Sequence, residues 1–131
     1  MRSRGKLFLV AFLARILFSL SAGFFASPES GGPFNYPDEN AYREHAQSLL
    51  DRGEFAQGPP DHALRTSRPP LYPFFLAGCQ AAFGPHRLAW IVPQAILGAL
   101  SCLLLLAIGS NLGLRGAGNV AAWGMALYPP L

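Results

Sequence analysis

The sequence predicts an all-α membrane protein, and three observations support that fold class. Of its 131 residues, 51% are hydrophobic and 13% are charged, about half the charged share of an average globular domain. Two apolar runs, 7–25 and 88–108, are each long enough to cross a hydrocarbon layer of about 30 Å as a helix. All seven acidic residues fall between Glu29 and Asp61, which indicates one polar loop between two membrane helices.

The first expected membrane helix covers residues 7–25 and follows the basic stretch MRSRGK. The positive-inside rule then puts the N-terminus in the cytoplasm and residues 26–87 outside. A cleaved signal peptide is the alternative interpretation, because such a peptide also opens with basic residues. Arg15 argues against it, since this residue interrupts the apolar run.

Arg15 has two interpretations of its own. An ionisable side chain at membrane depth usually faces the protein interior or a polar cavity. The alternative is that its long stem lets the guanidinium reach the membrane surface. Because Arg15 stands near the middle of the run, we favour a charge inside the membrane protein.

The outside loop, 26–87, is expected to carry two juxtamembrane helices, at 38–51 and 71–83. Gly53 suits the C-terminal cap of the first helix. The second segment has only about 13 apolar residues, too few to span a bilayer, so it predicts an interfacial or re-entrant helix.

The remaining chain predicts a second membrane helix at 88–108, a short cytoplasmic turn around Arg115, and the start of a third span at 117–131. Cys79 and Cys102 lie far apart in apolar segments, in no metal-ligand spacing and in no disulfide framework. The chain has no basic run with interleaved aromatics, so a nucleic-acid partner is not expected.

The acid pair Asp38 and Glu39 opens the first juxtamembrane helix. Acids in a first helical turn stabilise the helix by about 0.3–1 kcal/mol each, which accounts for Glu39. At 100° per residue, Asp38 shares the apolar face with Tyr42. A carboxylate on that face needs a metal, a cation or a substrate hydroxyl as its partner. A plain helix cap and a functional acid both remain open for Asp38.

A second polar motif, HALRTSRPPLYP at residues 62–73, places Arg65 and Arg68 just before an apolar segment. The planar guanidinium donates two parallel hydrogen bonds to phosphate oxygens, so these arginines suit a lipid phosphate. The alternative is non-specific binding of membrane head groups.

The order of these features resembles the N-terminal part of membrane glycosyltransferases of the GT-C type. The matching features are a span with an arginine, an outside Asp-Glu followed by Tyr, RPPLYP, a short apolar helix ending in FG, a second span, and ALYPP. The most similar groups are the bacterial relatives of protein O-mannosyltransferases and of the lipid A aminoarabinose transferase. The resemblance covers nearly all of residues 1–131, as part of one membrane domain.

The resemblance implies transfer of a sugar from a polyprenyl-phosphate donor to a hydroxyl of a glycan, lipid or protein, outside the bacterial plasma membrane. Asp38, with Glu39 beside it, takes the position of the acid that acts as base or orients the acceptor. Arg68 takes the position that contacts the lipid phosphate, and Tyr42 lines the donor pocket. Some members of the family hold a divalent metal near this acid. Ser67 stands where such members have an acidic metal ligand, so whether this chain binds a metal stays open.

The family normally has many more spans, so the chain is expected to be a fragment with no activity on its own. Two other function classes remain. One is a small non-enzymatic membrane scaffold, and the other is a transporter fragment in which Arg15 lies on the solute pathway.

Overall fold

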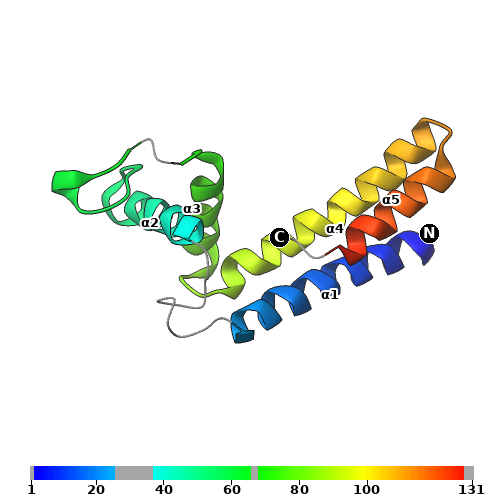
Figure 1. Ribbon diagram of the computed structural model, residues 1–131, viewed down its shortest axis with the longest axis horizontal. Helices are drawn as coiled ribbons and strands as arrows, with labels where there is room; N and C mark the ends of the chain where they lie inside the picture. Colours follow the sequence, from blue (N-terminus) through cyan, green and yellow to red (C-terminus); the bar gives the residue numbers. More distant parts are fainter. Residues whose placement is uncertain (1, 26–36, 66–67, 129–131) are drawn as a thin grey trace. The chain divides into compact units, whose positions relative to one another are not determined.

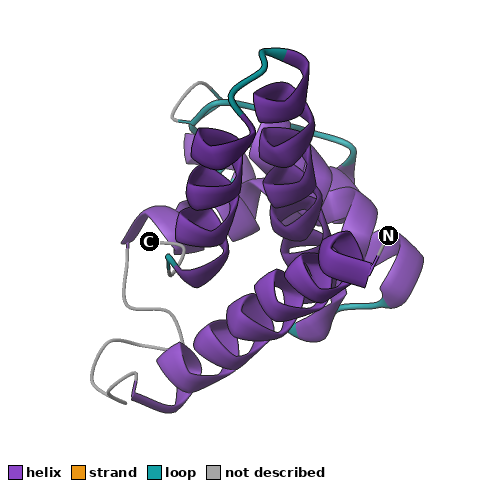
Figure 2. Cartoon of the chain, turned by 90° about the vertical axis from the view of Figure 1, so that its right-hand side faces the viewer, coloured by secondary structure: helices purple, strands orange, loops and turns teal. Residues whose placement is uncertain are grey.

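The computed structural model describes residues 2–25, 37–65 and 68–128, and only the backbone of residues 2, 22–25 and 37–39. Within these ranges the chain is all-helical and contains no strand, which confirms the predicted all-α class (Figure 2). The elements are α1 (Arg2–Phe25), α2 (Pro37–Arg52), the 3-10 helix η2 (Pro60–His62), α3 (Leu71–Phe83), α4 (Leu88–Asn111) and α5 (Arg115–Leu127), as labelled in Figure 1.

These bounds are close to the expected ranges, and the differences have local causes. Helix α3 covers the expected 71–83, and α2 is longer than 38–51 by one residue at each end. Helix α1 extends back to Arg2 because Arg and Lys are good helix formers. Helix α4 continues to Asn111, and the chain turns at Gly113, whose φ is +73°.

The chain divides into two compact units. Unit 1 comprises residues 1–22 and 91–131, and unit 2 comprises residues 23–90. Unit 1 therefore contains α1, most of α4 and α5, whereas unit 2 contains α2, η2 and α3.

The core of unit 1 is built from small side chains. Its fully buried residues are Leu7, Ala11, Ala99, Cys102, Ala122 and Ala126. A close backbone approach joins Gly109 of α4 to Gly118 of α5: a Cβ added to Gly109 would stand 2.5 Å from the Cα of Gly118. Small residues at a helix crossing let the backbones touch, as is typical of helix pairs in membranes.

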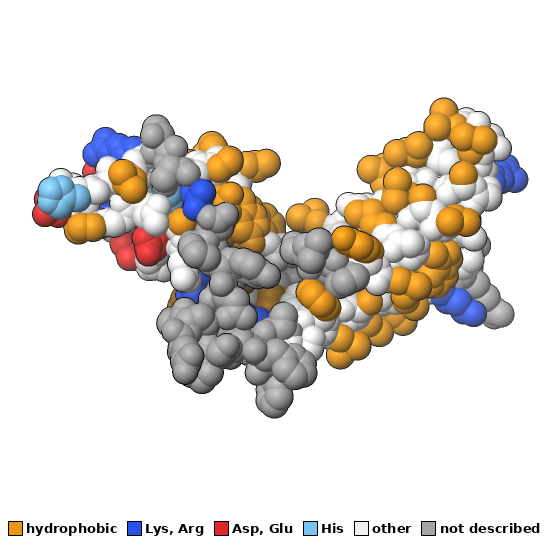
Figure 3. Space-filling view, viewed as in Figure 1, with side chains coloured by type: hydrophobic (Ala, Val, Ile, Leu, Met, Phe, Trp, Pro, Cys, Tyr) orange, Lys and Arg blue, Asp and Glu red, His pale blue; other side chains and the backbone are white. Residues whose placement is uncertain are grey.

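The outer surface of unit 1 is apolar. Side chains such as Leu17, Leu97, Leu104 and Val120 are exposed, and Figure 3 shows hydrophobic side chains gathered over α1, α4 and α5. Among the described residues, one helix, α4, is long and apolar enough to cross a membrane. Only 22% of its most apolar window is buried, whereas the core helix of a soluble protein is mostly buried.

Unit 2 is formed by α2 packed against α3. Gly53 ends α2 with a φ of +68° and donates its N–H to the carbonyl of Leu49 at 3.1 Å. The following loop folds back on itself through paired backbone hydrogen bonds between Gln57 and Leu64, each 2.9 Å. Ser48 of α2 fixes this loop, because its hydroxyl donates to the carbonyl of Glu54 at 2.7 Å.

Candidate functional site

The acid pair lies in the first turn of α2. The backbone of Asp38 and Glu39 is helical, which is consistent with either role of an acid at a helix start. Their side chains fall outside the described residues, so the catalytic assignments of both remain predictions.

Tyr42, Arg68 and Tyr72 form a contact that we call the tyrosine–arginine cluster. The guanidinium carbon of Arg68 lies 5.8 Å from the ring centroid of Tyr42. The Tyr42 ring meets the Tyr72 ring edge-on, with centroids 5.2 Å apart and an interplanar angle of 89°. The negative face of an aromatic ring attracts a guanidinium at this distance. The cluster thus brings together Arg68 and Tyr42, which the sequence assigned to the donor phosphate and donor pocket.

Arg65 has a different environment from Arg68. Its guanidinium lies 3.5 Å from a carboxylate oxygen of Glu54, and the two side chains are 71% and 53% exposed. An exposed ion pair of this kind contributes at most about 1 kcal/mol. Arg65 therefore contacts an acid, and Arg68 counts an aromatic ring among its contacts.

Arg43 is a second aromatic-paired arginine, and sequence reasoning missed this partner. Its guanidinium carbon lies 5.7 Å from the Trp90 ring. The i,i+4 spacing of Glu39 and Arg43 on one helix also predicts a pairing between them, which stays a prediction because the Glu39 side chain lies outside the described residues. The available signal was Trp90 beside the start of an apolar run, since tryptophan is enriched at membrane boundaries.

His45 lies in the core of unit 2, although the sequence assigned it no role. It is fully buried, and its Nδ1 lies 2.7 Å from the carbonyl oxygen of Ala41, to which an Nδ1–H donates. Its ring packs on Phe55, with centroids 4.4 Å apart. His62 and His86, by contrast, are exposed. His45 joins α2 to the loop that follows it.

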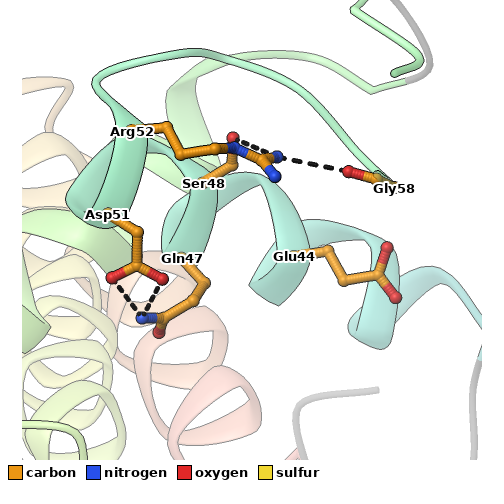
Figure 4. A pocket seen from close by; sticks show the side chains of 6 residues that line it. All are labelled: Glu44, Gln47, Ser48, Asp51, Arg52 and Gly58. Atoms are coloured by element: carbon orange, nitrogen blue, oxygen red, sulfur yellow. Dashed lines mark hydrogen bonds between the residues drawn. The ribbon is translucent and has the colours of Figure 1, made fainter. Parts of the chain in front are cut away.

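A shallow groove of about 380 Å³ lies on the polar face of α2 (Figure 4). Its lining residues are Glu44, Gln47, Ser48, Asp51, Arg52 and Gly58. The carboxamide nitrogen of Gln47 lies 2.9 Å from both carboxylate oxygens of Asp51. Arg52 donates to the Ser48 hydroxyl at 2.9 Å and to the Gly58 carbonyl at 3.2 Å. The polar groups of this groove thus bond to one another and attach the loop to α2.

No group of three metal-ligating side chains is found among the described residues. The question of a divalent metal, left open by the sequence, depends on Asp38, whose side chain is not described, so it stays open. Cys79, on α3, is also no ligand candidate: it is buried, and burial raises the pKa of its thiol.

Arg15 lies inside unit 1, where it is 8% exposed. Its guanidinium donates to the carbonyl of Ala11 at 3.1 Å and to the carbonyl of Met125 at 3.0 Å. The side chain therefore connects α1 to the last turn of α5.

Comparison of the chain with models of protein families, with characterised proteins and with solved structures finds no match. The functional argument accordingly rests on the residues of the chain itself.

Proposed function

We propose that this chain is the N-terminal part of a GT-C-type glycosyltransferase of the bacterial plasma membrane. It acts on a polyprenyl-phosphate-linked sugar and an acceptor hydroxyl at the outer face of that membrane. The observation that carries the proposal is the contact between Arg68 and Tyr42, at 5.8 Å from guanidinium carbon to ring centroid. These residues are 26 positions apart, and the resemblance implies a role at the donor for both.

Arg68 has the chemistry that the donor phosphate requires. When the bond from the sugar to the phosphate oxygen breaks, the phosphate gains negative charge. A preorganised guanidinium stabilises that charge through hydrogen bonds from its in-plane N–H groups. Tyr42 attracts the guanidinium through its ring, and Tyr72 in turn packs edge-on against the Tyr42 ring. A cation held in this way loses little side-chain entropy when the phosphate binds.

Asp38 supplies the acid in the proposal. It precedes Tyr42 by four residues in α2, which is about 6 Å along the helix axis. A carboxylate one helical turn from Tyr42 would lie beside the donor pocket. There it can accept the proton of the acceptor hydroxyl or orient that hydroxyl for attack. Glu39 lies beside it, and a divalent cation held by Asp38 would further neutralise the leaving phosphate.

The proposed topology has the N-terminus in the cytoplasm and α1, α4 and α5 as successive membrane segments. Support comes from the length and exposure of α4 and from the basic residues around Lys6 and Arg115, which mark cytoplasmic ends. Unit 2 then lies outside, where the acids and the tyrosine–arginine cluster meet a donor in the outer leaflet.

The first test measures donor binding. The full chain, in lipid nanodiscs, is titrated with polyprenyl phosphate, and bound lipid is counted by native mass spectrometry. Arg68→Gln should weaken binding about tenfold or more, since a charge-assisted hydrogen bond contributes about 1.5–3 kcal/mol. Arg65→Gln should have a smaller effect, because Arg65 faces Glu54. Arg4→Gln is the control for loss of one positive charge, and equal binding by all four chains would contradict the proposal.

The second test measures sugar transfer by the full-length protein that the gene encodes. Asp38→Asn should abolish transfer from a fluorescent polyprenyl-phosphate sugar while leaving donor binding intact. Transfer at the unmodified rate would rule out the assignment of Asp38. If Arg68→Gln and Asp38→Asn left both binding and transfer unchanged, a non-enzymatic membrane scaffold would be the better explanation.

A further inference from the structure

Helix α5 ends before two prolines, and this leaves a main-chain carbonyl without its usual partner. The last regular hydrogen bond of the helix joins the N–H of Tyr128 to the carbonyl of Gly124 at 2.9 Å. The next bond in the series would join residue 129 to the carbonyl of Met125. Residue 129 is a proline, and proline has no N–H to donate. The Met125 carbonyl therefore needs a donor from elsewhere.

Arg15 of α1 supplies that donor. Its Nη2 lies 3.0 Å from the Met125 carbonyl oxygen, and its Nη1 lies 3.1 Å from the carbonyl of Ala11. Nη2 also approaches the sulfur of Cys102 on α4 at 3.9 Å. The guanidinium thus contacts all three helices of unit 1, and its positive charge complements the negative end of the α5 dipole.

Gly98 of α4 gives the guanidinium its space. A Cβ at this position would collide with Nε of Arg15 and would stand 2.8 Å from its Cδ. Any residue larger than glycine would push the Arg15 side chain away from α4. The absence of a side chain at Gly98 is therefore what makes room for the Arg15 side chain against α4.

The contact lies about midway through the expected hydrocarbon layer. Arg15 follows Lys6 by nine residues and Met125 follows Arg115 by ten, so the two lie about 14 and 15 Å from those basic residues. Cys102 precedes Asn111 by nine residues, again about 14 Å. The N-terminus and the α4–α5 turn lie at the same end of these helices (Figure 1), so the three distances describe one depth.

Helix α5 is too short to cross a bilayer. Its 13 residues give a length of about 20 Å, against a hydrocarbon core of about 30 Å. A helix that starts at the membrane surface and has this length ends within the apolar layer, where water cannot satisfy its last carbonyls. Unit 1, residues 1–22 and 91–131, contains no Asp or Glu, so no acid of this unit competes for Arg15.

We propose that Arg15 caps an interrupted membrane helix: its guanidinium takes the place of the missing N–H of Pro129 and fixes the point at which the chain leaves α5. Arg15 is therefore a positioning residue for the C-terminal end of α5. This role is independent of the glycosyltransferase proposal, which rests on residues of unit 2.

The test uses Cys102 as a reporter, because its thiol is fully buried beside Arg15. The full chain carries Cys79→Ser, so Cys102 is the one remaining thiol, and its alkylation by N-ethylmaleimide is timed in detergent micelles. Arg15→Met keeps an unbranched apolar side chain, shorter than that of arginine, and removes the donors. Labelling should become about tenfold faster, as expected when one hydrogen bond from a charged group is lost. Arg4→Met should leave the rate unchanged.

Pro129→Ala distinguishes a cap from any other role of Arg15. It supplies the N–H that the helical series lacks at position 129, so the double variant Arg15→Met/Pro129→Ala should label within about threefold of the parent. If Arg15→Met accelerates labelling equally with and without Pro129→Ala, Arg15 does not act as the cap.

If Arg15→Met cannot be produced as a folded protein, a second variant, Gly98→Ala, tests the same contact. Gly98→Ala displaces the guanidinium while leaving Arg15 in place, and it should accelerate labelling in the same way, with the same rescue by Pro129→Ala. Labelling at the parent rate in Gly98→Ala would overturn the proposal, since the guanidinium would then not need its place beside α4.

Discussion

Gly109→Ala tests the close approach of α4 and α5. A Cβ at Gly109 would stand 2.5 Å from the Cα, 3.1 Å from the backbone nitrogen of Gly118, and 3.2 Å from the carbonyl oxygen of Leu114. All three atoms belong to the backbone, so no side-chain rotation relieves the clash. An ordinary contact needs about 3.5 Å or more, so the helices must separate by about 1 Å. Overpacking of this size typically costs about 1–3 kcal/mol.

Gly124→Ala is the matched control for this substitution. Gly124 lies in α5, and a Cβ there would meet nothing within 4 Å. Both substitutions gain the same helix propensity, about 1 kcal/mol, so this gain cancels when the two variants are compared. The difference between them measures the clash alone, and Gly109→Ala should be the less stable by about 1–3 kcal/mol.

The assay is thermal unfolding of the two variants in the same detergent, followed by helical circular dichroism. For a chain of this size, a difference of about 1–3 kcal/mol lowers the midpoint by several degrees. Gly118→Ala should behave like Gly109→Ala, because its Cβ would stand 2.8 Å from the Cα of Gly109. Equal midpoints for Gly109→Ala and Gly124→Ala would show that the helices do not meet at these glycines.

Three further predictions concern unit 2. Ser48→Ala removes the hydroxyl that donates to Glu54 and accepts from Arg52, so trypsin should cut faster after Arg52; an unchanged rate would mean that the hydroxyl does not hold the loop. Because burial raises the pKa of the Cys79 thiol, less thiolate is present at a given pH than for a free cysteine. The pH at which Cys79 alkylation reaches half its maximal rate should therefore lie above that of a cysteine peptide, and a lower value would contradict its burial. Arg65→Gln should change stability by less than about 1 kcal/mol, as for other exposed ion pairs, and a larger loss in thermal unfolding would mean that Arg65 has a partner besides Glu54.

The helices could be predicted because their signals are local. The apolar run of α4, its end near Gly113, and the acid-rich start and Gly53 end of α2 all lie within a few residues of the boundaries they determine. The helical part of the prediction depends on spacing and on turn residues, which the sequence displays directly. Its membrane part is supported by one helix long and apolar enough to cross.

The contacts of the arginines could not be predicted in the same way. Arg68 meets Tyr42 across 26 residues, Arg43 meets Trp90 across 47, and Arg15 meets Met125 across 110. Each depends on how helices pack, which hydrophobic spacing alone does not specify. The sequence could indicate that a guanidinium beside apolar residues needs a partner, but an aromatic face, a carbonyl and a carboxylate all meet that need.

The choice among those partners follows the distribution of acids along the chain. Every Asp and Glu lies in unit 2, residues 23–90, so an arginine there can find a carboxylate, as Arg65 does. Arg43 and Arg68, in the same unit, also lie near the aromatic rings of Trp90 and Tyr42, whose negative faces attract a guanidinium. In unit 1 no carboxylate exists, and the Met125 carbonyl, which Pro129 cannot satisfy, takes its place. Arg15 thus donates both to the Ala11 carbonyl of its own helix and to the Met125 carbonyl at the end of α5, where the helical hydrogen-bond series stops. Arg15 and the Pro-Pro pair that follows α5 are therefore best understood as one feature, and replacing either should change the effect of replacing the other.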